Sequence, residues 1–172
     1  KQSQKNRIIW LCGASTGIGY ALANDLINSG AQVIVSSRNL EKLKSFEGRA
    51  YTLQCDVKSN SDWNQCVEAI GKKFGSLDTF IYNAGDCQYL DIEAFDYEMI
   101  KHITEVNYLG LVKGVEQVLP LLRKGKQPYL VGVSSSVDSF ALSRAEAYGA
   151  SKAAMTYFLE SLRIDLVPES MD

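Results

Sequence analysis

Three glycines, Gly13, Gly17 and Gly19, stand where a strand pattern turns into a helix pattern, and this feature constrains the fold of the 172-residue chain more than any other. An apolar run at residues 8–11 precedes them, and apolar residues at helical spacing follow between residues 20 and 27. A strand, a tight turn and a helix N-terminus together present unpaired backbone N–H groups and the positive end of a helix dipole to an anion. Because a Cβ in such a turn would hold the backbone away from a phosphate, the pattern predicts a cradle for a dinucleotide pyrophosphate.

The glycine spacing, G-x-x-x-G-x-G, differs from the common G-x-G-x-x-G fingerprint, so the motif alone leaves other interpretations open. One is a tight connection that binds no ligand. Another is the nucleophile elbow of serine hydrolases, because residues 13–17 also spell G-x-S-x-G, with Ser15 as nucleophile and the single histidine, His102, as base. The hydrolase interpretation leaves Gly19 unexplained and finds no histidine near the C-terminal end. His102 is better interpreted as a residue on a helix face.

Strand and helix patterns alternate along the whole chain. The predicted strands are residues 7–12, 31–37, 50–55, 77–82 and 128–134. The predicted helices are residues 18–29, a short one at 39–46, one that starts near residues 59–61 and ends before Gly75, a long region at 92–122 broken near its start, and 145–166. Since parallel neighbours need long connections, this order predicts a Rossmann-like, doubly wound parallel α/β sheet in three layers, α/β/α, forming a single domain over residues 1–172. Ligands of such sheets bind at the carboxyl ends of the strands.

Composition excludes several classes of function. The net charge of -2 and the absence of a basic run argue against nucleic-acid binding. No stretch approaches the roughly 20 apolar residues of a membrane span, and the first seven residues are polar, so we expect a cytoplasmic protein without a transmembrane segment. The four cysteines, Cys12, Cys55, Cys66 and Cys87, form no C-x-x-C motif, so we expect reduced thiols, no disulfide framework and no metal site.

A second set of residues carries candidate chemistry. Tyr148 and Lys152 lie four positions apart in the last predicted helix and so face the same side of it. A nearby cation favours phenolate and lowers a phenol pKa that is about 10 in the free side chain, which suits a general acid or base. Ser135, thirteen residues before the tyrosine, ends the fifth predicted strand, where its hydroxyl could hold a substrate oxygen. Each feature alone is more often structural, and only their joint spacing indicates a catalytic site.

Together these motifs resemble the short-chain dehydrogenase/reductase family over residues 7–166. The resemblance implies that Tyr148 exchanges a proton with the substrate oxygen, while Lys152 lowers its pKa and holds the nicotinamide ribose. It implies that Ser135, rather than Ser134 or Ser136, orients the carbonyl. Asn107 matches the helix asparagine that completes a proton relay through water. The implied catalytic residues are therefore Asn107, Ser135, Tyr148 and Lys152.

The resemblance also extends to the cofactor. The run Asn83-Ala84-Gly85 matches the end of the family's Asn-Asn-Ala-Gly motif, which braces the sheet beside the cofactor, and Asp56-Val57 matches the pair that meets adenine. The second predicted strand ends at Ser37-Arg38 with no acid, and an arginine there pairs with a 2'-phosphate, which predicts NADP(H) over NAD(H). The opposing observation is Thr16, at a position where many NADP-dependent relatives carry a second basic residue. The predicted cofactor-binding residues are Gly13, Ser15, Thr16, Gly17, Ile18, Gly19, Ser37, Arg38, Asp56, Val57, Asn83, Ala84, Gly85, Tyr148 and Lys152.

The sequence departs from the family pattern in three places. Cys12 replaces a threonine, and Tyr82 replaces the first asparagine of the loop motif. Family members also continue past the last predicted helix, so we expect a domain truncated after that helix. The sequence predicts an NADP(H)-dependent oxidoreductase of small-molecule alcohols or carbonyls, with a non-catalytic nucleotide-binding or scaffold protein as the alternative. Relatives often assemble through the helices at residues 93–122 and 145–166, which implies a homodimer or homotetramer.

Overall fold

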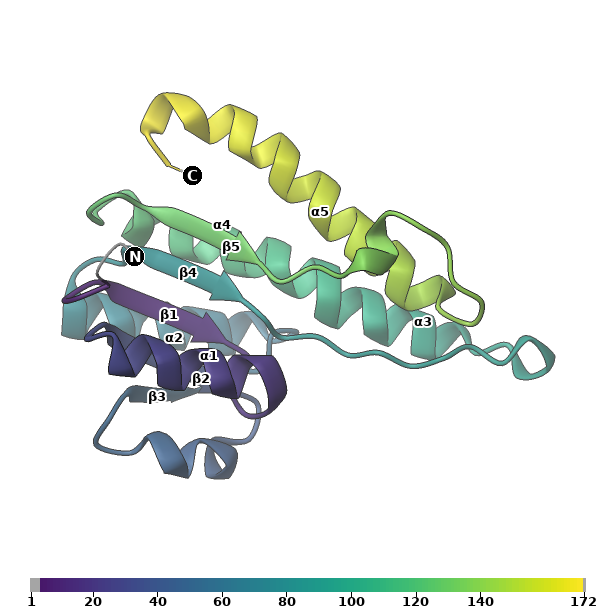
Figure 1. Cartoon of the computed structure of the whole chain (residues 1–172), viewed down its shortest axis with the longest axis horizontal. Helices are drawn as coiled ribbons and strands as arrows, with labels where there is room; N and C mark the ends of the chain where they lie inside the picture. The colour runs from purple at the N-terminus through teal and green to yellow at the C-terminus, as the bar shows by residue number, and fades with distance from the viewer. Residues whose placement is uncertain (1–3, 172) are drawn as a thin grey trace.

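The computed structural model describes residues 4–171 and contains one five-stranded sheet in which all neighbouring strands are parallel. The strand order is β3-β2-β1-β4-β5 (Figure 1). From β1 the chain moves outward to β2 and β3, then crosses to the other side for β4 and β5. The order therefore reverses between β1 and β4, and a crevice for ligands forms at the carboxyl ends of two such strands. The strands are β1 Ile8–Cys12, β2 Gln32–Ser37, β3 Tyr51–Gln54, β4 Thr79–Tyr82 and β5 Tyr129–Gly132.

Helices cover both faces of the sheet, which confirms the predicted three-layer fold (Figure 1). Successive side chains of a strand point to opposite faces. In β1, Trp10 packs in the cluster that includes residues of α2, α4 and α5, while Ile9 and Leu11 pack in the cluster that includes residues of α1. Burial on both faces explains the continuous apolar runs of the inner strands. The helices are α1 Gly17–Asn28, α2 Asn60–Phe74, α3 Tyr97–Thr104, α4 Gly110–Leu122 and α5 Glu146–Leu166.

Local signals set both ends of α2. The side chain of Ser59 accepts a hydrogen bond from the Asp62 amide and begins α2, and Gly75 ends it in a left-handed conformation with φ of 77°. The predicted helix at residues 39–46 is a 3-10 helix, η1, over Leu40–Phe46. No described helix is long and apolar enough to cross a bilayer.

The long helical region has an unexpected feature. It consists of a 3-10 turn, η2 (Ile92–Ala94), then α3, then a π-helical turn, η3 (Glu105–Leu109), then α4. The break near its start was predicted, but the π turn was not. The amide of Gly110 donates to the carbonyl of Glu105, five residues earlier, so the helix accommodates one extra residue here. The π turn contains Asn107.

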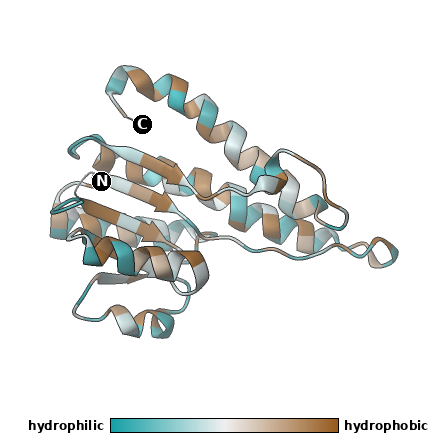
Figure 2. Cartoon of the chain, in the orientation of Figure 1, coloured by the Kyte–Doolittle hydropathy of each residue, from teal (hydrophilic) through white to brown (hydrophobic). Residues whose placement is uncertain are grey.

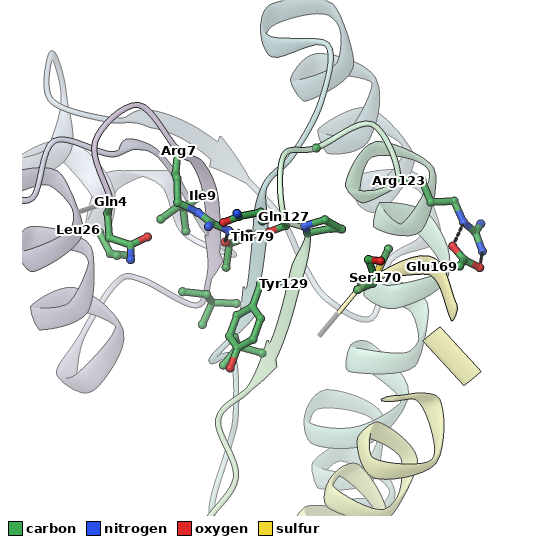
Figure 3. Close-up of a pocket in the computed structure, with 15 residues that line it drawn as sticks. Gln4, Arg7, Ile9, Leu26, Thr79, Arg123, Gln127, Tyr129, Glu169 and Ser170 are labelled. Carbon is green, nitrogen blue, oxygen red and sulfur yellow. Dashed lines mark hydrogen bonds and ion pairs between the residues drawn. The ribbon is translucent and has the colours of Figure 1, made fainter. Parts of the chain in front are cut away.

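One part of the sheet has no helix in front of it. On the face that α1 covers at β1 and β2, the strands β4 and β5 lie uncovered in Figure 1 and carry apolar residues in Figure 2. A cavity of about 870 Å³ lies on this side, lined by Ile9, Ile81 and Val131 and, toward the amino ends of the strands, by Arg7 and Tyr129 (Figure 3). One guanidinium nitrogen of Arg7, Nη2, donates to the carbonyls of residues 78 and 127 and to a threonine hydroxyl at position 79. The cavity contains none of the predicted site residues.

Candidate active site

The glycine loop joins β1 to α1 and leaves the first turn of that helix open to an anion. Thr16 occupies the N-cap position in an extended conformation, but its side chain accepts no capping hydrogen bond, and the first turn carries no acidic residue. The N–H groups at a helix N-terminus need acceptors, and the dipole favours negative charge there. The residues present therefore fit the phosphate-binding role that the sequence predicts.

Two of the three glycines are required by close approach of backbone to backbone. Gly13 has φ of 90°, and a Cβ on it would lie 2.5 Å from the amide nitrogen of Ala84. A Cβ on Gly19 would overlap the carbonyl oxygen of Gly13. That carbonyl accepts a hydrogen bond of 2.7 Å from the side-chain amide of Asn83. Asn83 thus ties the loop after β4 to the loop after β1.

Gly17 differs from the other two glycines. Its φ is 56°, and a Cβ on it would have nothing within 4 Å. A left-handed conformation, rather than lack of room, explains glycine at this position.

A groove of about 150 Å³ lies at the carboxyl ends of β1, β2, β3 and β4, where ligands of doubly wound sheets bind. Three lining residues were not predicted from the sequence: Cys12, which ends β1, Cys55, which follows β3, and Val106 in η3. For the two cysteines, their positions at strand ends were the available signal. Most predicted cofactor residues line the groove: Gly13, Ser15, Thr16, Ser37, Arg38, Val57, Asn83, Ala84 and Gly85.

The other predicted cofactor residues lie outside this lining. Gly17, Gly19 and Ile18 belong to the first turn of α1, where the Ile18 side chain is 69% exposed. The Asp56 carboxylate accepts a hydrogen bond from the Lys58 amide within its own turn. A contact between Asp56 and adenine therefore remains a prediction.

Arg38 lies at the end of β2, beside the groove, with an exposed side chain. Its backbone carbonyl accepts a hydrogen bond from Gln54, and the hydroxyl of Ser37 accepts one from the Asn39 amide. Within residues 4–171 the guanidinium of Arg38 forms no ion pair with an acid. The groove therefore carries a positive charge at this edge.

Lys152 and Tyr148 project from α5 near the groove. Lys152 is 5% exposed, and its ammonium donates a 2.7 Å hydrogen bond to the Val133 carbonyl and lies 5.8 Å from the centroid of the Tyr148 ring. Burial lowers the pKa of Lys152 below its usual value, and the Cys87 thiol acts more weakly in the opposite direction. A Cβ on Gly85, which lines the groove, would lie 3.6 Å from Lys152 Nζ. The lysine therefore borders both the tyrosine and the groove.

Asn107 connects the loop after β4 to α5. It is buried in the π turn, where its Oδ1 accepts a 2.8 Å hydrogen bond from the Asp86 amide and its Nδ2 donates to the Asp86 carbonyl at 2.9 Å. The same Nδ2 donates to the hydroxyl of Ser151, which donates in turn to the Tyr148 carbonyl. Ser151 was not predicted as a site residue, although it lies within the Tyr-x-x-x-Lys motif. These hydrogen bonds explain why a buried polar residue, Asn107, is accommodated inside a helical region.

The serines after β5 differ in what their hydroxyls contact. The Ser134 hydroxyl lies 2.8 Å from the Thr156 hydroxyl and donates to the Asp138 carboxylate at 3.0 Å. Ser135 precedes the short 3-10 turn η4 (Ser136–Asp138) and makes no side-chain capping bond to it. The turn packs against α5. Ser134 therefore serves the local structure, while the Ser135 hydroxyl makes no capping contact, and its place beside the Tyr148 hydroxyl remains a prediction.

His102 lies on α3, with its Nε2 3.0 Å from the Asp86 carboxylate. Burial acts to raise the pKa of Asp86, but hydrogen bonds from Gln88, His102 and the Cys87 amide outweigh it and hold that pKa below its usual range. Ser15 instead lines the groove at the carboxyl ends of the strands. The structure thus pairs His102 with an acid and gives no support to the hydrolase interpretation.

The strand order, the glycine loop and the groove define a doubly wound α/β protein with a nucleotide-type crevice. The sequence matches the short chain dehydrogenase family over residues 7–171, and the protein belongs to this family of oxidoreductases, which act on CH–OH and C=O groups with a nicotinamide cofactor.

Named relatives agree with this assignment. An uncharacterized oxidoreductase of Listeria innocua is 30% identical, with 96% of this chain and 69% of that protein covered. The farnesol dehydrogenase of Aedes aegypti is 28% identical, with 93% of this chain and 70% of that protein covered. A Pseudomonas aeruginosa RhlG/NADP complex superposes with a TM-score of 0.92 at 25% identity, over 99% of this chain and 71% of that one. The ligand-free aldohexose dehydrogenase of Thermoplasma acidophilum superposes with a TM-score of 0.89 at 27% identity. The superposition covers 98% of this chain and 64% of that one.

Proposed function

We propose that the protein is an NADP(H)-dependent oxidoreductase that interconverts an alcohol and a carbonyl compound, with Tyr148 as general acid and base. The observation that carries the proposal is the position of Gly85, which lines the groove while a Cβ on it would lie 3.4 Å from Asn107 Oδ1 and 3.6 Å from Lys152 Nζ. The groove and the candidate proton-transfer residues therefore both lie next to Gly85.

The residues that would hold the cofactor are those of the glycine loop and Arg38. The open first turn of α1 would bind the pyrophosphate, and the Arg38 guanidinium would pair with the 2'-phosphate. The NADP complex formed by the Pseudomonas relative supports this choice of dinucleotide. When bound, the nicotinamide would supply or accept the hydride.

The protein's own part in the reaction is proton transfer. In reduction, the Tyr148 hydroxyl would donate its proton to the substrate oxygen as that oxygen gains negative charge, and in oxidation the phenolate would take the proton back. The buried Lys152 ammonium would stabilise the phenolate, because a cation beside a phenol favours its ionised form. Ser135 would donate a hydrogen bond to the same substrate oxygen. The side-chain atoms of Asn107 already contact Asp86 and Ser151, so its part in a water relay would use the main chain.

The relatives' names support an alcohol or carbonyl substrate. The Aedes relative is a farnesol dehydrogenase, and a bovine relative that is 31% identical is a retinol dehydrogenase. Both names specify alcohols with long apolar chains. We accordingly propose primary or allylic alcohols and their aldehydes as the first substrates to assay.

Replacing Tyr148 with phenylalanine tests the proposal. The substitution removes the proton-transfer group but keeps the ring, so turnover of NADPH with aldehydes should fall by about 10²–10⁴-fold while NADPH binding, followed by fluorescence, changes little. The matched control is Tyr157→Phe, because Tyr157 lies on the same helix with 76% of its surface exposed. Normal turnover by the Tyr148 variant would contradict the proposed chemistry. An unaltered protein that binds NADPH and reduces no carbonyl compound would favour the non-catalytic alternative.

A further inference from the structure

Tyr82, the last residue of β4, makes a contact that the family resemblance does not explain. Its side chain is fully buried, with 0% of its surface exposed, and its hydroxyl donates a 2.5 Å hydrogen bond to the carbonyl oxygen of Val106. Tyr82 stands where the family's loop motif begins with asparagine. A tyrosine reaches much farther than an asparagine, so this residue can contact the helix layer from the end of a strand.

The acceptor, Val106, belongs to the π turn that holds Asn107. A π turn changes the hydrogen-bond register of the helix, and buried carbonyls whose usual partner is displaced need another donor. The Tyr82 hydroxyl supplies such a donor to the residue directly before Asn107. The Tyr82 hydroxyl therefore contacts the backbone directly before Asn107, whose conformation determines where the Asn107 side chain points.

Gly110 makes room for this contact. It follows the π turn as the first residue of α4, and a Cβ on it would overlap the Tyr82 hydroxyl oxygen. The same Cβ would lie 3.0 Å from a methyl group of Val57, which lines the cofactor groove. Tyr82 and Gly110 are thus complementary in size, because the large side chain on the strand needs a residue without a side chain opposite it on the helix.

We propose that Tyr82 is a positioning residue for the proton-transfer chemistry, acting through the Val106 carbonyl on Asn107. By holding that carbonyl it fixes the π turn in the register that directs the Asn107 carboxamide to the Asp86 backbone and to Ser151. The Ser151 hydroxyl in turn contacts the Tyr148 carbonyl. This inference rests on the proposed function, because it assigns Tyr82 to the site at which Tyr148 acts.

Tyr82→Phe tests the inference, since it removes the hydroxyl and keeps the packed ring. We expect kcat to fall about tenfold, the size of effect associated with one hydrogen bond, while the Kd for NADPH stays within about twofold. The pH profile of kcat should also shift, because the variant alters the setting of the proton-transfer group. A purely structural role would lower thermal stability and leave the pH profile unchanged. Tyr108→Phe is the control, because it removes a hydroxyl from the same turn and leaves the Val106 contact in place.

Gly110→Ala and the double variant Gly110→Ala/Tyr82→Phe provide a second test that does not depend on Tyr82→Phe alone. Gly110→Ala should reduce kcat more than Tyr82→Phe does, because its Cβ overlaps the Tyr82 hydroxyl, and the double variant should recover part of that loss because the hydroxyl is gone. Unchanged kcat in Tyr82→Phe, or strictly additive losses in the double variant, would overturn the inference. If Tyr148→Phe is inactive in the same assays, such a result rejects only the role of Tyr82. Full activity of Tyr148→Phe would instead reject the proposed function itself.

Discussion

The edge that carries the cofactor groove and the loops beyond it are built in opposite ways. At the groove, short loops pack backbone against backbone: the Gly13 amide donates to the Ser36 carbonyl, the Asn83 amide to the Cys12 carbonyl, and the Asn83 side chain to the Gly13 carbonyl. Beyond it, residues 86–96 and 136–145 extend from the sheet as longer segments with short 3-10 turns (Figure 1).

The extended segments are held to each other by few contacts. The Leu90 amide donates to the Arg144 carbonyl at 2.8 Å, and the Arg144 side chain donates back to the Leu90 carbonyl at 3.2 Å. Large side chains here are exposed, Tyr89 at 65% and Phe140 at 53%. Segments with few buried contacts open at low free-energy cost, and binding regions are often drawn from them. Backbone contacts therefore shape the edge that carries the groove, whereas exposed side chains dominate the extended segments beyond it, which we propose as the substrate-binding side.

The largest effect is expected from adding one carbon atom to the edge where backbone packs against backbone. Gly13→Ala places a Cβ 2.5 Å from the Ala84 amide nitrogen in a conformation with φ of 90°, so we expect loss of NADPH binding and a large fall in melting temperature. Gly17→Ala meets nothing within 4 Å and adds only the left-handed conformational cost of about 1–2 kcal/mol. Thermal unfolding and NADPH titration of the two variants measure the difference. Equal effects would show that backbone contact between β1 and β4 does not set the groove.

The adjacent residues Ser134 and Ser135 should differ in the same way, one affecting stability and the other activity. Ser135→Ala should lower kcat/KM by about 100-fold, the effect of removing one donor to a developing oxyanion, and leave NADPH affinity and stability unchanged. Ser134→Ala should lower stability by about 1 kcal/mol, because its hydroxyl contacts Thr156 and Asp138, and affect kcat/KM far less. Steady-state kinetics and chemical denaturation of both variants test this division. The reverse pattern would assign the carbonyl-orienting role to Ser134.

Local patterns predicted the sheet, the glycine turn and the placement of Tyr148 and Lys152 well. The apolar runs of the strands and the caps of α2 are set by neighbours in sequence, and residues four apart on a helix share a face whatever the tertiary fold. Strand ends shifted by at most two residues, as with β5, predicted at 128–134 and observed at Tyr129–Gly132.

Features that depend on contacts across the fold were not predicted. The π turn at Asn107 arises where the Tyr82 hydroxyl and the Asp86 backbone meet the helix, and neither partner is near Asn107 in sequence. Likewise, Cys12 lines the groove because β1 and β2 end side by side, which depends on strand order. Hydrophobic periodicity carries no information about such pairings.

The smallest effect is expected at Arg38, because this residue would contribute a charge to the groove and not a backbone contact. Arg38→Gln should weaken NADPH binding by about 10- to 100-fold through loss of a charge-assisted contact, and leave NADH binding nearly unchanged because NADH lacks the 2'-phosphate. Arg49→Gln is the matched control, since it removes the same charge from an exposed arginine that contacts Asn24 and does not line the groove.

The salt dependence of the two affinities separates this effect from a general change in charge. An exposed guanidinium–phosphate contact weakens as ionic strength rises, so the preference for NADPH over NADH should narrow in high salt for the unaltered protein and for Arg49→Gln. In Arg38→Gln the preference should already be lost and should respond little to salt. If NADH binds as tightly as NADPH to the unaltered protein at low salt, Arg38 does not select the cofactor. The glycine loop would then hold either dinucleotide, because a backbone cradle for the pyrophosphate does not distinguish them.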